Sequence, residues 1–298
     1  MTTPASICRR LALVAGLLAA GLATTSAAAG ERTPDTYAFR TLDFPGASST
    51  IVWGLNDRDE LAGQYAIGSG VSHAMTWRHG KFEALAPAHL GQGFSAAGGP
   101  GDDGTTWGGY ADATGLQHGF VIRDGRFKTV DFRGHANSNI DAVDDCGRLL
   151  GVYWDADGAF HGMLVQHGNE TPFDVDGASD TYPLGINGAG DSVGYWDAAG
   201  AGTHGYLRQA NGRVTTIDVP AAVATVAFAI NDRGQVAGYY ADAAGGLHGF
   251  VKTGQHVQQI DVPTGVVTIV TTINNRGNIA GEYFDAAGVR HGFVATLE

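Results

Sequence analysis

The sequence has little charge and few basic side chains. Among its 298 residues are 18 Lys and Arg and 30 Asp and Glu, which gives a formal net charge of −12. Proteins bind nucleic acid and anionic membrane surfaces through clustered basic side chains, so this shortage argues against both partners. Hydrophobic residues make up 44% of the chain, which is enough for a core and argues against disorder.

The chain is rich in glycine as well as poor in charge. The 46 glycines are roughly twice the ordinary share of about 7%. No Gly-X-Y period accompanies them, which excludes a collagen-like chain. The composition therefore predicts a globular protein with many tight turns.

Residues 1–29 have the order of a secretory signal peptide. Arg9 and Arg10 precede an apolar run from Leu11 to Ala23, and three alanines end at Ala29. The run is shorter than the roughly 20 residues that span a bilayer, although an uncleaved anchor is the alternative. The sequence thus predicts a secreted or periplasmic chain with a short linker at 30–35 and a single domain at 36–298. Cleavage removes Cys8, so we expect Cys146 to remain as a lone thiol without an internal disulfide.

A repeat of about 43 residues runs through the rest of the chain. Histidines of an HGF-like tripeptide recur at spacings of 45, 43, 43, 44 and 43: His73, His118, His161, His204, His248 and His291. A glycine stands ten residues before each of them: Gly63, Gly108, Gly151, Gly194, Gly238 and Gly281. A hydroxyl residue precedes each glycine by thirteen: Thr50, Ser95, Ser138, Thr181, Thr225 and Thr268. Such self-similarity identifies a repeat architecture.

Each repeat is predicted to form four short antiparallel strands. In the fifth copy, segments rich in Val, Ile, Tyr and Phe are separated by Asn, Asp and Gly turns between Thr225 and Val262. Six tandem units of this kind predict an all-β, six-bladed β-propeller. The segment Thr36–Phe44 matches a fourth strand, and the last unit stops after its third, so we expect the N-terminal strand to close the ring by joining the last blade. An open β-solenoid or a differently phased barrel is the alternative.

Several phrases resemble a known bacterial family. They are LDFPG from Leu42, GLNDRDELAGQY from Gly54, IDVP from Ile217 and Ile260, and INDRGQVAGYYADAAGGLHGF from Ile230. Together they resemble the HAF-type probable extracellular repeats. The resemblance implies an extracellular or periplasmic repeat protein, and it carries no catalytic residues.

The polar residues that recur in every unit are predicted to be structural. A hydroxyl, a histidine and an aspartate, such as Thr225, His248 and Asp218 or Asp242, have the chemistry of a nucleophilic triad. Six copies favour instead a hydrogen-bond network that holds each blade together. The predicted network consists of Thr50, His73, His118, His161, His204, His248 and His291.

No cofactor is predicted. The turns at Asn56–Asp59, Asp102–Gly104, Asp144–Gly147 and Asn231–Gly234 place carboxylates and amides at one rim, where calcium could find oxygen ligands. None has the alternating carboxylate pattern of a calcium loop, and no two histidines have zinc-like spacing. Calcium therefore stays an alternative to the absence of any metal.

Residues that depart from the repeat are the better guide to a site. The first strand of the third unit is unusually polar, with Asn137, Asn139 and Asp141. Corners around the same face hold His89, His135, Asp180 and Tyr182, and Trp107 and Trp53 replace smaller or other apolar residues. Because the first strands should line the axis, the sequence predicts a ligand pocket there.

Two functions follow from this pocket. The first is a non-catalytic binding or interaction module, a monomer that takes a carbohydrate, peptide or protein ligand on its axial face. The alternative is a propeller hydrolase or lyase acting on a polysaccharide or lactone, with Asp141, His135 or Asp180 as acid and base. Because no unique, closely spaced acid/base pair stands apart from the repeat, the sequence favours the binding module.

Overall fold

A computed structural model describes residues 35–298 except 69, 86–92, 136 and 199–201. The predicted signal peptide, nearly all of the predicted linker and His89 lie outside the described residues. Nowhere in the described part of the chain is there a helix with the length and apolarity needed to span a bilayer.

The described chain is all β. Four separate antiparallel sheets have four strands each and run in chain order from the inside to the outside of the molecule. The first two are β6 (Ser95–Pro100), β7 (Thr106–Ala111), β8 (Gln117–Arg123) and β9 (Arg126–Val130), and β10 (Asn137–Val143), β11 (Leu149–Trp154), β12 (Phe160–Gln166) and β13 (Asn169–Phe173). The next two are β14 (Asp180–Ile186), β15 (Ser192–Ala198), β16 (Gly202–Arg208) and β17 (Val214–Ile217), and β18 (Ala224–Ile230), β19 (Val236–Ala241), β20 (Leu247–Thr253) and β21 (His256–Ile260).

The remaining strands form one eight-stranded sheet in which the two ends of the chain meet. Its members are β1 (Tyr37–Leu42), β2 (Ser49–Leu55), β3 (Leu61–Ala66), β4 (His73–Arg78), β5 (Lys81–Ala84), β22 (Val267–Ile273), β23 (Ile279–Phe284) and β24 (Arg290–Leu297). β1 pairs with β24 along its whole length, from Tyr37 opposite Leu297 to Leu42 opposite Gly292. The predicted pairing of the N-terminal strand with the last strand is confirmed.

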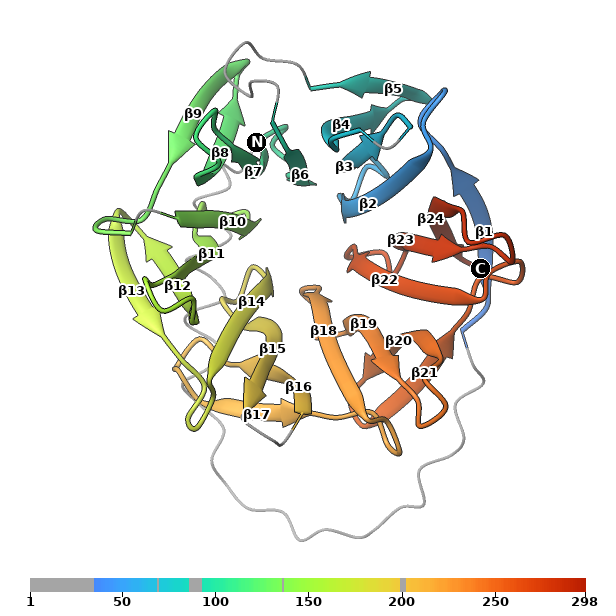
Figure 1. Cartoon of the computed structure of the whole chain (residues 1–298). Helices are drawn as coiled ribbons and strands as arrows, with labels where there is room; N and C mark the ends of the chain where they lie inside the picture. Colours follow the sequence, from blue (N-terminus) through green and yellow to red (C-terminus); the bar gives the residue numbers. More distant parts are fainter. Residues whose placement is uncertain (1–34, 69, 86–92, 136, 199–201) are drawn as a thin grey trace, which may run out of the picture.

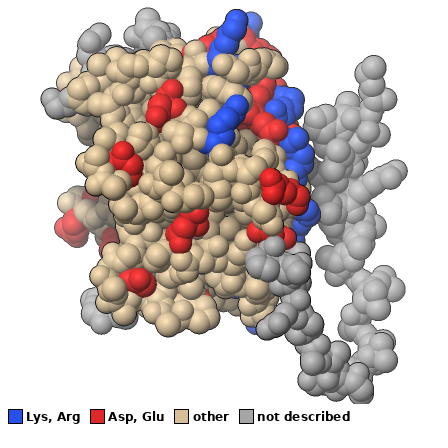
Figure 2. Space-filling model, turned by 90° about the vertical axis from the view of Figure 1, so that its right-hand side faces the viewer, with Lys and Arg blue, Asp and Glu red and all other residues tan. Residues whose placement is uncertain are grey.

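The sheets stand around a central axis as in a propeller (Figure 1), with β2, β6, β10, β14, β18 and β22 innermost. The core lies between neighbouring sheets. For example, Val193 and Ile217 pack against Ala227 and Phe250 of the next sheet. Figure 2 shows one side of this ring, where most of the surface carries no charged group. Apolar contact between neighbouring sheets therefore helps to hold the ring together.

The glycine that precedes each histidine by ten is required by a close approach of two strands. A Cβ on Gly238 would lie 2.0 Å from the carbonyl oxygen of Val226, and a Cβ on Gly63 would lie 2.0 Å from that of Ile51. In both cases the second strand of the sheet crosses the first too closely for any side chain. This column of glycines is thus fixed by the fold.

The expectation of a lone thiol at Cys146 applies to the chain after removal of Cys8, and it stays a prediction for that chain. Cys146 is disulfide-bonded. The prediction rested on the removal of Cys8, which lies outside the described residues.

Candidate functional site

Each innermost strand has a β-bulge at the same position of the repeat. In β10 the pairing with β11 shifts between Ile140 and Ala142, which leaves Asp141 as the extra residue. The other innermost strands shift at the corresponding place. The six bulge residues are Trp53, Gly98, Asp141, Leu184, Phe228 and Thr271. All six line one cavity at the axis.

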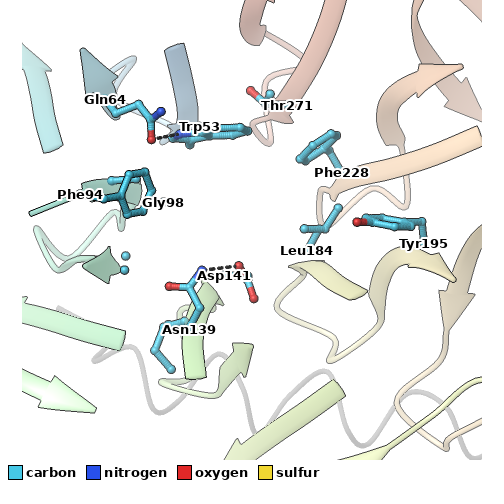
Figure 3. Close-up of a pocket in the computed structure, with 14 residues that line it drawn as sticks. Trp53, Gln64, Phe94, Gly98, Asn139, Asp141, Leu184, Tyr195, Phe228 and Thr271 are labelled. Carbon is cyan, nitrogen blue, oxygen red and sulfur yellow. Dashed lines mark hydrogen bonds between the residues drawn. The ribbon is translucent and has the colours of Figure 1, made fainter. Parts of the chain in front are cut away.

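This axial cavity has a volume of about 290 Å³ and lies between the bulges of the innermost strands (Figure 3). Aromatic rings of Trp53, Phe94, Tyr195 and Phe228 form much of its wall. Small residues of β6 and β7 also line it, and Gly109 makes room for Asn139, because a Cβ there would lie 2.0 Å from Asn139 Oδ1. The size suits a small organic ligand, and the aromatic faces suit an apolar surface on it.

The polar part of the wall centres on Asp141 and Asn139 of β10. The Asn139 amide donates to Asp141 Oδ1 at 2.9 Å. The other carboxylate oxygen, Asp141 Oδ2, and the amide oxygen of Asn139 are buried without a hydrogen-bond partner in the protein. Across the cavity, Trp53 Nε1 donates to Gln64 Oε1 at 3.3 Å (Figure 3). Two acceptor oxygens beside the cavity therefore lack a hydrogen-bond partner within the protein.

Burial raises the pKa of Asp141 to about 7, and hydrogen bonds from Asn139 and from the Val152 backbone oppose this rise only in part. The described residues of the lining include no Lys, Arg or His. Asp141 therefore has no basic partner there. Near neutral pH this carboxyl group changes between its neutral and its charged form.

The other predicted ligand residues lie outside the cavity lining. Asn137 Oδ1 accepts the Gln117 N–H, and Asp180 Oδ1 accepts the Phe160 N–H, so each ties an innermost strand to the third strand of the preceding sheet. His135 stacks on Tyr153, with ring centroids 3.7 Å apart.

Two further predicted residues support the wall from behind. Tyr182 stacks on Tyr195, with centroids 4.4 Å apart, and Trp107 is buried with its Nε1 donating to the Asp141 carbonyl at 3.3 Å. The sequence analysis did not select Gln64, Phe94, Leu184, Tyr195, Phe228 or Thr271. One feature of the sequence could have indicated Leu184, Phe228 and Thr271. They occupy the same position of the repeat as Trp53 and Asp141, and the side chains at this position differ widely in type among the six units.

A second, polar depression of about 130 Å³ lies at the other end of the axis, where the innermost strands turn. Side-chain amides there bond to the backbone of the next repeat: Asn231 to Asn274 O, Asn274 to Asn56 O, and Asn56 to Gly101 O. Burial and the neighbouring carboxylates Asp102 and Asp232 raise the pKa of Asp145 to about 6. In the described residues, no three His, Cys, Asp or Glu side chains are grouped so that they could hold a metal.

The repeated histidines form clamps at the sides of the sheets. His248 Nδ1 lies 3.0 Å from Asp261 Oδ1, and its Nε2 lies 3.4 Å from Asp242 Oδ2, while the ring packs against Tyr240. His118, His161 and His291 each lie between two aspartates at the corresponding positions of their own repeats, and His204 pairs with Asp218. Six residues before His73 and His204 stand Ile67 and Ala198, where the other four histidines have an aspartate. The described contact of His73 is with Tyr65.

The repeated hydroxyls take part in a separate set of hydrogen bonds. Thr225 Oγ1 accepts the Val219 N–H at 3.1 Å, and Thr50 Oγ1 accepts the Phe44 N–H at 2.9 Å, which fixes the corner that enters each innermost strand. Thr225 and Thr50 are buried, whereas the clamp histidines are partly exposed. In the described contacts these hydroxyls bond to backbone, so the repeated hydroxyl, histidine and aspartate do not assemble into a triad.

We expect His248→Ala to lower the Tm by about 2–4 °C at pH 5.5 and by less at pH 9. Burial lowers the pKa of His248, but hydrogen bonds and charges of Asp261 and Asp242 outweigh this and leave the pKa raised above 6.5. A raised histidine pKa contributes stability that is fully present below the unfolded pKa and is lost as the pH rises through the folded pKa. The lowered pKa of Asp242 sets the acid limit, because its contribution is lost as the pH falls through that value.

Thermal unfolding followed by circular dichroism across this pH range measures the effect. His73→Ala is the matched control, because His73 lacks the aspartate pair and its removal breaks no clamp. Equal pH dependence in the two variants would contradict the clamp.

The fold places the chain among all-β, propeller-like proteins built from repeated four-stranded sheets. No protein-family model matches the chain, and no curated protein matches it. Among solved structures it is similar to a mutant of AofleA from Arthrobotrys oligospora, with a TM-score of 0.52 and 12% identity over 87% of this chain and 86% of that one. A variant of Aleuria aurantia lectin, in complex with alpha-methyl-L-fucoside, gives a TM-score of 0.51 and 11% identity over 86% and 96%.

The chain is also similar to TolB from Acinetobacter baumannii, with a TM-score of 0.51 and 10% identity over 84% of this chain. It spans 64% of the TolB chain. At these identities the likeness concerns the fold alone.

Proposed function

We propose that the protein is a non-catalytic binding module whose axial cavity takes a small organic ligand with an apolar face and hydrogen-bonding groups, such as a sugar ring. The observation that carries this proposal is the pairing of aromatic walls with two unpartnered acceptor oxygens, Asp141 Oδ2 and Asn139 Oδ1, in one cavity. Buried polar atoms without partners are rare in proteins, and a ligand that donates to them removes their cost. The similar lectin, whose complex contains a fucoside, supports a carbohydrate as the first class to test.

The alternative of a hydrolase or lyase is less well supported by the cavity. The pKa of about 7 would suit Asp141 to proton transfer. Two-carboxylate hydrolysis requires a second acidic group within about 5–10 Å, and the described lining contains no second Asp or Glu. Asp180 and His135, the other proposed acid and base residues, lie outside that lining.

The ring is proposed to have six blades. The eight-stranded sheet then counts as two blades, β2–β5 and β22–β24 with β1, because β24 and β2 share a single parallel bridge between Ser49 and Arg290. Export by the N-terminal segment and membership of the HAF-type repeats remain part of the proposal, as does a monomeric state.

A panel of glycans and metabolites screened by thermal shift, followed by calorimetry on each ligand found, tests the proposal. We expect Trp53→Ala to weaken binding by about tenfold, because stacking on an aromatic face is worth about 1 kcal/mol or more. Trp154→Ala is the matched control, since Trp154 packs against Phe160 and is absent from the lining. A ligand whose affinity is the same in the wild type and in Trp53→Ala does not bind in this cavity and contradicts the proposal.

A further inference from the structure

The axial cavity offers hydrogen-bond acceptors and lacks positive charge. Asp141 Oδ2 and Asn139 Oδ1 are buried and unpartnered, while three donors of the lining already bond within the protein. The Asn139 amide bonds to Asp141, Trp53 Nε1 bonds to Gln64, and the Thr271 hydroxyl bonds to the carbonyl of Val52 at 2.6 Å. A ligand that satisfies this site therefore brings hydrogen-bond donors of its own.

The aromatic walls also favour positive charge. Trp53 and Phe228 face the axis from opposite sides of β22, with ring centroids 6.1 Å apart and an interplanar angle of 33° (Figure 3). Tyr195 and Phe94 add two more rings to the same cavity. The face of an aromatic ring attracts an ammonium group, and this attraction grows when water is excluded.

The electrostatic setting points in the same direction. No basic side chain stands in the described lining, and the net charge of the chain is −12. A negative chain around a cavity with one carboxyl group attracts cations and disfavours anions. The aromatic walls, the unpartnered acceptors and the negative charge of the chain thus all favour a ligand with a positive charge.

We propose that the axial cavity binds a protonated organic amine, whose ammonium group donates to Asp141 Oδ2 and Asn139 Oδ1 while its apolar body contacts Trp53 and Phe228. This inference rests on the proposed function, because it names the ligand class of the same cavity. A buried carboxylate paired with an ammonium group makes a stronger hydrogen bond than two neutral partners do.

Binding of the amine is coupled to a proton. Below pH 7 Asp141 is mostly neutral, and an arriving ammonium ion favours its charged form. The carboxyl group therefore gives up its proton to solvent, and the complex holds a carboxylate and an ammonium ion. The titratable groups that face Asp141 from other strands are tyrosines, Tyr195 in the lining and the buried Tyr206 of β16, and burial raises the pKa of both. Neither tyrosine ionises near pH 7, so the released proton comes from Asp141.

Isothermal titration calorimetry with benzylamine and its neutral counterpart benzyl alcohol tests the inference. At pH 8 we expect benzylamine to bind at least tenfold more tightly than benzyl alcohol. Below pH 7 we expect the affinity for benzylamine to fall about tenfold per pH unit. In Asp141→Asn the preference for benzylamine over benzyl alcohol should vanish. Wild-type titrations in phosphate and in Tris at pH 6.5 provide a second readout, because released protons change the measured heat by the difference in buffer ionisation enthalpy. This readout remains if Asp141→Asn fails to fold.

The outcomes separate the inference from the proposed function. Equal or tighter binding of benzyl alcohol, or binding of benzylamine without proton release, overturns the amine as ligand and leaves the cavity as a binding site. The same holds if neither compound binds while a neutral member of the ligand panel depends on Trp53. If neither compound nor any member of the panel binds in a Trp53-dependent way, both proposals fail.

Discussion

Gly238→Ala is expected to destabilise the protein by about 3 kcal/mol and to lower its Tm by about 10 °C. The new methyl carbon would lie 2.0 Å from the Val226 carbonyl oxygen and 2.9 Å from the Phe250 ring. Real Cβ atoms do not approach a backbone oxygen this closely, so β19 would have to move away from β18. That movement would open the packing of buried Phe250 against the neighbouring sheet.

Chemical denaturation followed by tryptophan fluorescence measures this loss. Gly188→Ala is the matched control, because the nearest atom to its Cβ is Asp232 Oδ1 at 3.0 Å, the end of a side chain that can rotate away. Sister repeats carry Asp57, Asp102, Asp145, Asp232 or Asn275 at the position of Gly188, so a side chain fits there. If Gly188→Ala proved as damaging as Gly238→Ala, the close approach of strands would not explain the glycine column.

Removal of β1 is expected to have the largest effect on the fold. A chain that begins at Phe44 loses six paired residues along β24, and it loses the buried Leu42 together with Tyr37 and Phe39, which pack on the core around Phe293. Burial of each large apolar side chain is worth about 1.5–3 kcal/mol, so the truncation removes about 5 kcal/mol or more. This is comparable to the total stability of many domains, about 5–15 kcal/mol.

The matched control is a chain that begins at Asp35 and keeps β1. We expect this control to unfold cooperatively near the temperature of the full chain, and the shorter chain to be partly unfolded or aggregated because β24 exposes an unpaired edge. Size-exclusion chromatography and circular dichroism distinguish these states. A shorter chain that stays monomeric with an unchanged Tm would show that the pairing of β1 with β24 is dispensable.

The sequence predicted the scaffold because the scaffold repeats. Four strands per unit and the Asn and Gly turns leave marks that recur about every 43 residues, and the segment Thr36–Phe44 matches the missing fourth strand of the last unit. The clamp histidines were also predicted to be structural. Their separation from the hydroxyls was not predicted, because His248 lies on the third strand and Thr225 on the first, and only the packed sheet shows that they face different surroundings.

The candidate site was predicted in part, for a reason that is also physical. Asn139 and Asp141 were selected because polar residues stand out on a strand whose counterparts are apolar. Leu184 and Phe228 do not stand out from their counterparts in this way, since apolar residues are common in strands. Gln64 and Tyr195 belong to second strands, and their reach into the cavity depends on how neighbouring sheets are set around the axis. That geometry is not encoded in the spacing of residues within one repeat.

In the innermost strands, the residues that pair in the ladders hold the ring together, whereas the bulge residues line the cavity. Each bulge residue falls outside the register of its strand pair, and its six versions range from Gly98 to Trp53 while the surrounding ladders stay alike. Exchanging such a residue alters the interior without disturbing the strand register. Natural variation or a designed library confined to these six positions could therefore change ligand preference on a constant framework, which makes the protein a scaffold for engineered receptors.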